Sequence, residues 1–499
     1  EEVQSQLGQE YSLVIGGKAY DTRATIGSMN PSNKKQLIGR VASARAEQAA
    51  QAIEIARRAA NDWSRTDPAE RIQFIETVAT ELRGRRYELA AWEVFECGKP
   101  WAEADADVAE AIDFCEYYGR EMLRLAVPQR MQRVPGELNH LSYQGRGVAA
   151  VIAPWNFPLA ILTGMTTAAL VAGNPVIVKP AEQSMGIAAR FFSLAREAGT
   201  PPGALHFLPG LGEEVGAHLV AHRDVATIAF TGSKAVGLAI WRQAGTTIPG
   251  QVGLKRVVCE MGGKNAIIVD SDADLDAAVL GIVRSAFGFA GQKCSACSRV
   301  VVLPEQHDAL IERLAAAMES LHVMPPTDPG CFVGPVIDAE AHRRLLGALA
   351  EARRRGHQAK VGGAPLEGAG FFVPPTLFVD VPADDPLVTD ELFGPVLAVQ
   401  RADDFEHALT LATGVEYALT GGLYSRSPAR IARAREAFRV GNLYINRGIT
   451  GAIVGRQPFG GFAMSGGGTK AGGPDYLLHF LDPRTITENT LRRGFAPEE

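Results

Sequence analysis

The sequence of 499 residues is short of cysteine and of long apolar runs. Six cysteines in so long a chain do not make a disulfide framework, and they fit a reducing compartment: the cytoplasm, or the mitochondrial matrix if a transit peptide has been removed. No stretch approaches the roughly 20 uninterrupted apolar residues of a membrane helix. The acidic, polar start of the chain does not resemble a signal peptide. We therefore expect no membrane partner.

Basic charge is also scarce. The chain carries 50 Lys and Arg against 56 Asp and Glu and has no long basic run, so no nucleic-acid partner is expected. Its length and ordinary composition suggest about three globular domains. Glycine, in contrast, is abundant, with 53 residues, and it clusters at 209–216, 250–263, 455–473 and around Cys294. Such clusters indicate tight backbone turns close to ligands.

Hydrophobic patterns predict an α/β fold. Short extended segments in 11–45 precede helical patterns over 46–62, 68–97 and 101–124. From residue 147, short apolar strands alternate with helices. The expected strands are 148–152, 176–178, 205–208, 227–230, 265–269, 300–303 and 394–399. This alternation predicts parallel sheets covered on both faces, with ligands at the carboxyl ends of the strands.

Two further segments have other patterns. Residues 129–146 alternate apolar and polar around a turn at 133–136, which indicates a strand pair. It has little core of its own, so we expect an arm that pairs with another subunit. Residues 484–490 read as another exposed strand. The helix over 101–124 carries acids on one side, which predicts a solvated face; these are Glu103, Asp107, Glu110 and Asp113.

Cys294 lies in a run of small and polar residues that leaves room for a substrate to reach its sulfur. Backbone N–H groups nearby would favour the thiolate, the nucleophilic form of a thiol. The spacing to Cys297 also fits a redox pair, half of a zinc site or plain packing, although no second cysteine pair or histidine cluster accompanies it. This stretch alone leaves all of these interpretations open.

Three polar side chains near predicted strand ends are candidates for chemistry. Asn156 could donate to an oxyanion on a substrate held at a cysteine, or could simply form a turn. Glu260, beside two glycines, could act as a general base in a partly dry site, or lie at the surface. Glu391 precedes an aromatic residue and a tight turn and has the same character.

A second group of residues suggests a cofactor site. Lys179 and Glu182 follow a strand and could hold the hydroxyls of a ribose, or form a solvated pair. Ser233 stands at the start of a helix between Gly232 and Gly237, whose small size lets a pyrophosphate approach the backbone. The pattern is not Gly-x-Gly-x-x-Gly, so by itself it is a weak signal for a dinucleotide.

Together, seven of these motifs have the order and rough spacing of the NAD(P)-dependent aldehyde dehydrogenase superfamily, which the chain resembles over its whole length. The motifs are Trp155–Pro158, Lys179–Glu182, Phe230–Ser233, Glu260–Gly263, Gly291–Cys294, Glu391–Pro395 and Pro458–Gly461. The resemblance implies the aldehyde dehydrogenase fold, with a Rossmann-like cofactor domain, an α/β catalytic domain and a β oligomerisation arm. The expected NAD-binding domain is 1–128 with 147–258. The expected catalytic domain is 259–440, with the loop region 441–480 at the active site, and the arm is 129–146 with 481–499.

The resemblance also implies roles. Cys294 is the expected nucleophile, Asn156 and the N–H of Cys294 the oxyanion hole, and Glu260 the base that lets water rather than coenzyme A resolve the thioester. The expected cofactor is NAD, with NADP possible, since the charge of Glu182 disfavours a 2′-phosphate. No metal is expected. The expected cofactor-binding residues are Lys179, Glu182, Gly232, Ser233, Gly237, Glu391, Phe393, Pro154 and Trp155.

Residues 291–299, 451–462 and 470–476 resemble the branch of the superfamily that oxidises L-glutamate γ-semialdehyde to glutamate. This implies a monofunctional, homo-oligomeric enzyme. The expected substrate contacts are Ser295, Gly451 and Ala452 at the α-carboxylate, Phe157 and Phe459 at the aliphatic middle, and Glu110 at the α-amino group. The alternatives are another semialdehyde, such as succinate semialdehyde, or a non-catalytic member of the fold.

Overall fold

The computed structural model describes residues 1–366 and 368–491, so 492–499 of the predicted arm lie outside the described residues. A first seven-stranded sheet has the order β12-β11-β8-β9-β10-β2-β3. Its first five strands are parallel, and β2 and β3 are added antiparallel. In chain order they are β2 Leu13–Ile15, β3 Lys18–Tyr20, β8 Val148–Ile152, β9 Val176–Lys179, β10 Leu205–Phe207, β11 Val225–Thr231 and β12 Arg256–Glu260.

Helices cover both faces of this sheet. Every residue of its central strands β8 and β9 is buried, and all of them except Lys179 are apolar. The long helices are α2 Ala46–Arg65, α3 Pro68–Gly84, α4 Arg86–Cys97, α5 Trp101–Ala126, α6 Ala160–Val171, α7 Met185–Glu197 and α9 Lys234–Ala244. The sequence predicts a helical pattern over 68–97. The structure has two helices there, α3 and α4, because the backbone of Arg85 (φ −113°, ψ 22°) leaves the helical conformation.

Short elements complete this half of the molecule. A small sheet of order β1-β5-β4 lies near the N-terminus. The short elements are α1 Glu2–Ser5, β1 Gln9–Tyr11, β4 Thr25–Asn30, β5 Asn33–Ala42, a π-helical turn Gly212–Gly216 and α8 Ala217–Ala221.

A second seven-stranded sheet has the order β15-β16-β17-β14-β13-β19-β20, and only β15 runs antiparallel to its neighbour. Its strands are β13 Asn265–Val269, β14 Cys297–Val302, β15 Ala359–Val361, β16 Thr376–Phe378, β17 Val396–Arg401, β19 Thr420–Tyr424 and β20 Asn442–Ile445. Its helices are α10 Leu275–Phe287, α11 His307–Glu319, α12 Ala339–Arg354, α13 Pro386–Thr389, α14 Phe405–Thr413 and α15 Pro428–Ala437, with a 3₁₀ turn at Pro304–Gln306. The predicted α/β fold with parallel sheets is confirmed. The predicted boundary at 258 falls inside β12, and the division into domains stays a prediction.

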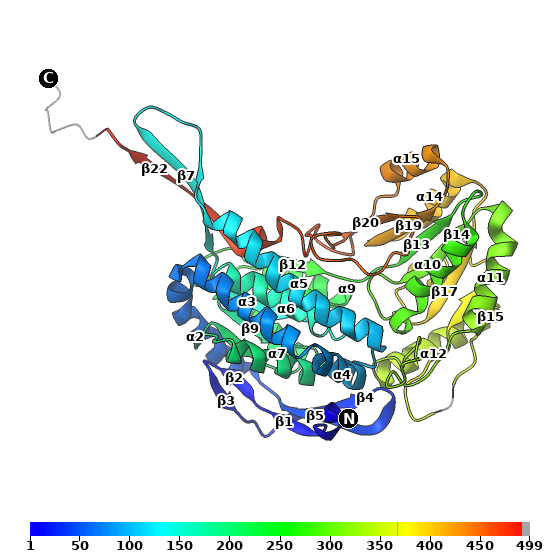
Figure 1. Ribbon diagram of the computed structural model, residues 1–499, viewed down its shortest axis with the longest axis horizontal. Coiled ribbons are helices and arrows are strands. Elements are labelled where there is room, and N and C mark those ends of the chain that lie inside the picture. Colours follow the sequence, from blue (N-terminus) through cyan, green and yellow to red (C-terminus); the bar gives the residue numbers. More distant parts are fainter. Residues whose placement is uncertain (367, 492–499) are drawn as a thin grey trace.

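We call the half of the molecule built on the first seven-stranded sheet the first body, and the half built on the second such sheet the second body. The arm projects from the first body, as Figure 1 shows for β7 and β22. It is the sheet β22-β7-β6, made of β6 Gln129–Arg130, β7 Glu137–Gly145 and β22 Leu481–Asn489. β22 pairs with β7 antiparallel over its whole length, from Leu481 opposite Gly145 to Asn489 opposite Glu137. The predicted strands of the arm are therefore present.

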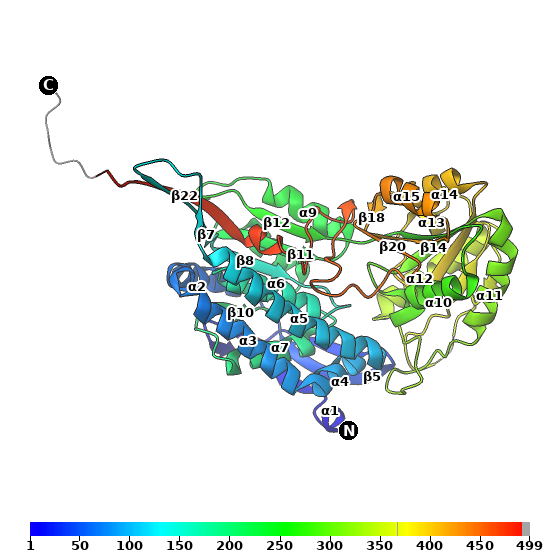
Figure 2. The same ribbon diagram turned by 45° about the horizontal axis from the view of Figure 1, so that its top comes forward.

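Between β20 and the arm, the chain crosses from the second body back to the first; this orange-red segment is visible in Figures 1 and 2. It contains β21 Phe462–Ala463, which pairs with β18 Tyr417–Ala418, and a 3₁₀ turn at Tyr476–Phe480. Met261, directly after β12, donates its N–H to the carbonyl of Ser465 at 2.8 Å. The glycine-rich segment thereby lies against the carboxyl end of the first sheet.

Candidate active site

Cys294 follows a strained turn between α10 and β14. Phe289 and Ala290 have left-handed backbones (φ 52° and 53°), a conformation that costs a non-glycine residue roughly 1–2 kcal/mol. Gly291 continues the turn at φ 68°, and a Cβ there would lie 2.4 Å from the carbonyl oxygen of Gly394, so only glycine fits. Strain of this kind persists where the surrounding structure fixes it, which is common at functional sites.

Asn265 fixes the loop that carries Cys294. Its Nδ2 donates to the carbonyls of Cys294 (2.8 Å) and Ala296 (2.9 Å), and its Oδ1 accepts the N–H of Thr420 at 2.9 Å. The sequence did not identify this residue. Its only signal was a polar side chain at the first position of an otherwise apolar strand.

Asn156 lies beside the same loop. Its buried side chain donates from Nδ2 to the carbonyl of Gln292 at 3.0 Å, two residues before Cys294. Gln292 is held in turn, because its Oε1 accepts the N–H of Ile337 at 2.9 Å. The structure thus brings the predicted oxyanion donor to the predicted nucleophile, although the two are 138 positions apart in the numbering.

Glu260 ends β12 and is only 9% exposed, so the surface alternative is wrong. Its Oε1 accepts from the hydroxyl of Thr469 at 2.6 Å, and its Oε2 accepts from the N–H of Gly461 at 3.2 Å. Burial raises the pKa of this carboxyl to about 8, against the opposing effect of these two donors and of Lys470. The carboxyl can therefore gain or lose a proton near neutral pH.

The thiol of Cys294 is half-buried, and burial raises its pKa to about 12. The negative charges of Glu391 and Glu260 act in the same direction. The N–H groups of Ser295 and Cys294 act in the predicted direction, toward the thiolate, but their effect is smaller. Burial thus outweighs the N–H groups, and the thiol must lose its proton as it reacts.

The predicted ribose residues do form an ion pair. Lys179, at the end of β9, donates to Glu182 Oε1 at 2.8 Å, and the same oxygen accepts the N–H of Gly212 at 2.8 Å. Lys179 is 3% exposed and the Glu182 side chain 33%, so the lysine side of the pair is not solvated as the alternative interpretation supposed.

Ser233 is the N-cap of α9 and accepts the N–H of Val236. Gly237 lets this helix approach the sheet, because a Cβ there would lie 2.5 Å from the sulfur of Met261. A Cβ at Gly232 would lie 2.6 Å from the ring of Phe230. The N-terminus of α9 thus sits at the carboxyl edge of the first sheet, where the sequence predicted a phosphate site.

Glu391 and the aromatic residues come from the second body and from the turn after β8. Glu391 Oε1 accepts the N–H of Gly263 at 2.8 Å, and Gly263 follows Glu260 by three residues in the chain. Phe393 (φ 52°) meets the ring of Trp155 edge to face, with 5.8 Å between centroids. Pro154 is buried next to Trp155.

The predicted substrate residues are less directly connected. Ser295 adjoins Cys294 and is buried, whereas Gly451 (φ 75°) is exposed and Ala452 half-buried. Phe459 pairs through its backbone with Ala471. No hydrogen bond or ring contact among the described residues joins Gly451, Ala452 or Phe459 to Cys294, so their roles stay predictions.

Glu110 lies on α5, and burial followed by the charge of Asp107 raises its pKa to about 8. The segment after Gly451 runs along the same helix, since a Cβ at Gly455 would lie 3.1 Å from the ring of Tyr117, two turns beyond Glu110. The segment that follows Gly451 therefore contacts α5, the helix that carries Glu110. A role for Glu110 toward an amino group stays a prediction.

The solvated face predicted for α5 is wrong at Asp107, which is 1% exposed. Asp107 forms a buried ion pair with Lys99 and accepts the N–H of Ala160 at 2.7 Å. Lys99 also donates to the backbone carbonyl of Asn156 at 3.1 Å and lies over the ring of Phe157, 4.4 Å from its centroid. Asp107 thus faces the segment around Asn156 rather than water, whereas Asp113 on the same helix is exposed, as predicted.

Cys297 is buried, and its Sγ donates to the carbonyl of Arg299 at 3.3 Å. All six cysteines are free. In the part of the chain that the structure describes, no group of three or more His, Cys, Asp and Glu could hold a metal ion. These observations favour packing as the role of Cys297.

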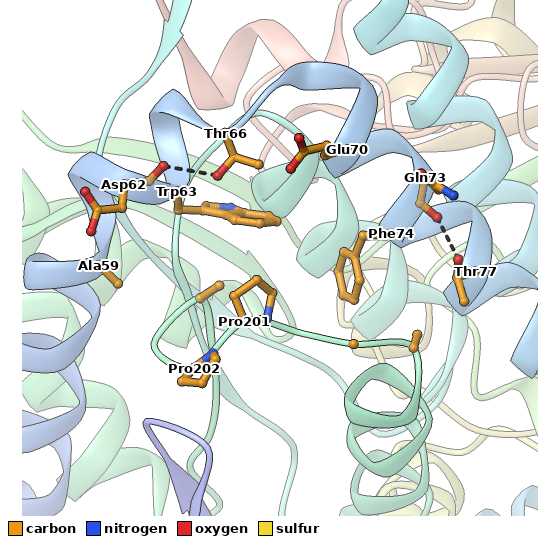
Figure 3. A pocket seen from close by; sticks show the side chains of 13 residues that line it. Ala59, Asp62, Trp63, Thr66, Glu70, Gln73, Phe74, Thr77, Pro201 and Pro202 are labelled. Atoms are coloured by element: carbon orange, nitrogen blue, oxygen red, sulfur yellow. Dashed lines mark hydrogen bonds between the residues drawn. The ribbon is translucent and has the colours of Figure 1, made fainter.

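One cavity, of about 520 Å³, lies elsewhere, between α2, α3 and the turn before β10. Figure 3 shows Trp63, Phe74, Pro201 and Pro202 on its walls. It includes none of the predicted site residues. Within the described residues, no helix is long and apolar enough to cross a membrane.

Comparison with known proteins agrees with this geometry. The model of the aldehyde dehydrogenase family matches residues 19–486. The 1-pyrroline-5-carboxylate dehydrogenase of Geobacillus thermodenitrificans is 48% identical over 488 residues, which are 98% of this chain and 95% of that protein. A Thermus 1-pyrroline-5-carboxylate dehydrogenase with bound NAD superposes with a TM-score of 0.96 at 46% identity, over 98% of this chain and 94% of that one.

Proline utilization A from Bdellovibrio bacteriovorus is 52% identical with a TM-score of 0.97; it matches all of this chain, which spans only 52% of that larger protein. The expectation of a single activity stays a prediction. The family expected from the seven motifs and the fold that it implies are confirmed. The chain belongs to the aldehyde dehydrogenase family.

Proposed function

We propose that this protein oxidises L-glutamate γ-semialdehyde, the open-chain form of 1-pyrroline-5-carboxylate, to L-glutamate with NAD, the second step of proline catabolism. The observation that carries the proposal is near-complete coverage at 48% identity by proteins named 1-pyrroline-5-carboxylate dehydrogenase, in a chain that retains Cys294, Glu260 and Asn156. The intact site argues against a non-catalytic member of the fold.

The residues present fit NAD. The first-turn N–H groups of α9 suit a pyrophosphate, and that turn contains no acidic residue to oppose it. Lys179 and Glu182, at the end of β9, would hold the adenosine ribose, and the charge of Glu182 favours NAD over NADP. Glu391 and Phe393 would hold the nicotinamide side, with Pro154 and Trp155 close by.

In the first half of the mechanism, Cys294 attacks the aldehyde carbon and gives up its thiol proton. The carbonyl oxygen becomes an oxyanion, which the Asn156 amide and the N–H of Cys294 stabilise. Bound NAD would supply the acceptor for the hydride that this carbon loses, which would leave a thioester on Cys294. Because burial raises the pKa of the thiol to about 12, the proton leaves the sulfur as the carbon–sulfur bond forms and passes to water.

In the second half, Glu260 takes a proton from the water that attacks the thioester carbon. The carbon–sulfur bond then breaks, glutamate leaves, and the sulfur of Cys294 recovers a proton. A carboxyl with a pKa raised to about 8 suits this work, since it can both accept and release a proton near neutral pH.

The proposed carboxylate anchor is the loop at Gly451 and Ala452, together with the hydroxyl of Ser295. Within the described residues, the backbone N–H groups of Gly451 and Ala452 donate to no protein acceptor, so both are available to donate to a carboxylate. Phe157 and Phe459 would enclose the aliphatic chain, and Glu110 would meet the amino group. The rival substrate, succinate semialdehyde, has no amino group for Glu110.

The proposal includes assembly with further copies of this chain, in a reducing compartment that suits its six free cysteines. In addition to the arm, α9 exposes Val236, Leu238 and Trp241 to 49%, 39% and 45%. Exposed apolar side chains grouped on one helix are typical of an interface. It also includes the domain division given above, with the segment 441–480 bordering the active site.

The test is a substrate panel. We expect kcat/KM for glutamate semialdehyde to exceed that for succinate semialdehyde at least tenfold, roughly the value of one good polar contact. NAD should be preferred to NADP. Cys294→Ala should abolish turnover while NAD still binds, as titration calorimetry would show. Equal or inverted preference for the two semialdehydes would refute the substrate, and turnover by Cys294→Ala would refute the nucleophile.

A further inference from the structure

The carboxyl of Glu260 lies in a cradle made by the glycine-rich segment. A Cβ at Gly460 would lie 3.0 Å from Oε1, and a Cβ at Gly466 would lie 2.9 Å from Oε2. The backbone of Glu260 also forms an antiparallel bridge with Gly466. These glycines leave room for the carboxyl, and the segment supplies both hydrogen bonds that it accepts, from Gly461 and Thr469.

Thr469 is the one side chain in this cradle that donates to Glu260, and it is 5% exposed. The loop that carries it is held firmly. Phe459 and Ala471 exchange two backbone hydrogen bonds of 2.9 and 2.8 Å, and Lys470 donates to the carbonyl of Gly460 at 2.6 Å. The hydroxyl is therefore presented from a fixed position.

We propose that Thr469 is a positioning residue for hydrolysis of the thioester: its hydroxyl holds Glu260 in one orientation and stabilises the charged form that accepts a proton from water. This role rests on the proposed function of Glu260 as the base. The 2.6 Å separation of the oxygens is typical of a hydroxyl that donates to a carboxylate.

The surroundings of Glu260 set the sign of the effect. The titratable groups that interact with it electrostatically are Cys259, Cys294, Lys470 and Tyr476. Only Lys470 is a cation, and its effect on the pKa of Glu260 is smaller than that of the Thr469 hydroxyl. Burial raises that pKa and the hydroxyl lowers it, so removing the hydroxyl raises the pKa further.

The experiment compares pH profiles of kcat. In the wild type we expect the rate to rise with pH toward a plateau above about 8, because only the unprotonated Glu260 accepts a proton. Thr469→Val keeps the side-chain shape and should move this limb up by about one pH unit, about a tenfold loss at pH 7. Thr469→Ser should restore the wild-type profile. The matched control is Thr410→Val, on the exposed side of α14, where the profile should not change.

Two further readouts separate the outcomes. If hydrolysis alone is slowed, Thr469→Val should still release about one equivalent of NADH per site before a slow steady state. Hydrolysis of p-nitrophenyl acetate, which acylates the thiol without NAD or semialdehyde, should show the same shifted limb. A Thr469→Val profile that superimposes on the wild type, or a loss that Thr469→Ser does not restore, overturns the proposal. Failure to oxidise glutamate semialdehyde with the ester result intact refutes only the substrate.

Discussion

Two groups of buried carboxyls in this molecule are stabilised in opposite ways. Glu260 accepts from two neutral donors, a hydroxyl and a backbone N–H, and burial raises its pKa to about 8. Between α4 and α5, Glu93 and Asp107 flank the fully buried amine of Lys99. Burial opposes the charge of that amine, but the two acids raise its pKa above its ordinary value.

The partners of a buried carboxyl determine whether it can accept and release a proton near neutral pH. A carboxyl with neutral partners changes its charge near neutral pH without breaking an ion pair. The buried pair keeps its charges and works as an anchor, because Lys99 donates to the carbonyl of Asn156, the predicted oxyanion residue. The first group is the one that we propose for the reaction, whereas the second holds the backbone carbonyl of Asn156.

The largest expected effect is that of Glu260→Gln. The amide keeps the shape of the side chain but cannot accept a proton from water, so kcat should fall by about 10²–10⁴-fold. The rapid release of the first NADH should survive, and the unfolding midpoint should barely move. The control is Glu47→Gln, at an exposed position of α2. Loss of only a few-fold in kcat would remove Glu260 from the mechanism.

Lys99→Met should give the opposite outcome, a loss of stability. Removing the amine leaves Asp107 buried without its cation, which costs about 3–5 kcal/mol of the free energy of unfolding. The measurement is the midpoint of urea unfolding, with the exposed Lys360→Met as control. A variant as stable as the wild type would mean that the pair contributes nothing, and the comparison with Glu260 would fail.

The motifs located Cys294, Glu260 and Asn156 because each stands in a local pattern of residue types. They could not locate the groups that hold these side chains, because such contacts join distant parts of the chain. Asn265 holds the carbonyl of Cys294 across 29 residues, and Thr469 reaches Glu260 across 209. Neither separation has a periodicity that a sequence would reveal.

The fold itself was easier to predict, because alternating apolar strands and helices allow few architectures. Local pattern was misleading where burial depends on tertiary packing. Asp107 shares its side of α5 with other acids, a spacing typical of a solvated face. It is nevertheless buried in an ion pair with Lys99, which follows helix α4. Helical periodicity identifies a face but not what covers it.

The smallest expected effect distinguishes the two acids beside Lys99. Burial, followed by the charge of Asp107, raises the pKa of Glu93 well above its ordinary value, which favours the neutral acid. Glu93→Gln keeps the shape of the side chain without its charge and should change the free energy of unfolding by less than about 1 kcal/mol. Asp107→Asn removes a charge that Lys99 needs and should cost several times more. Urea unfolding of both variants is the measurement. Equal losses would show that Glu93 is charged, that Lys99 is balanced by two carboxylates, and that this group differs from Glu260 more sharply still.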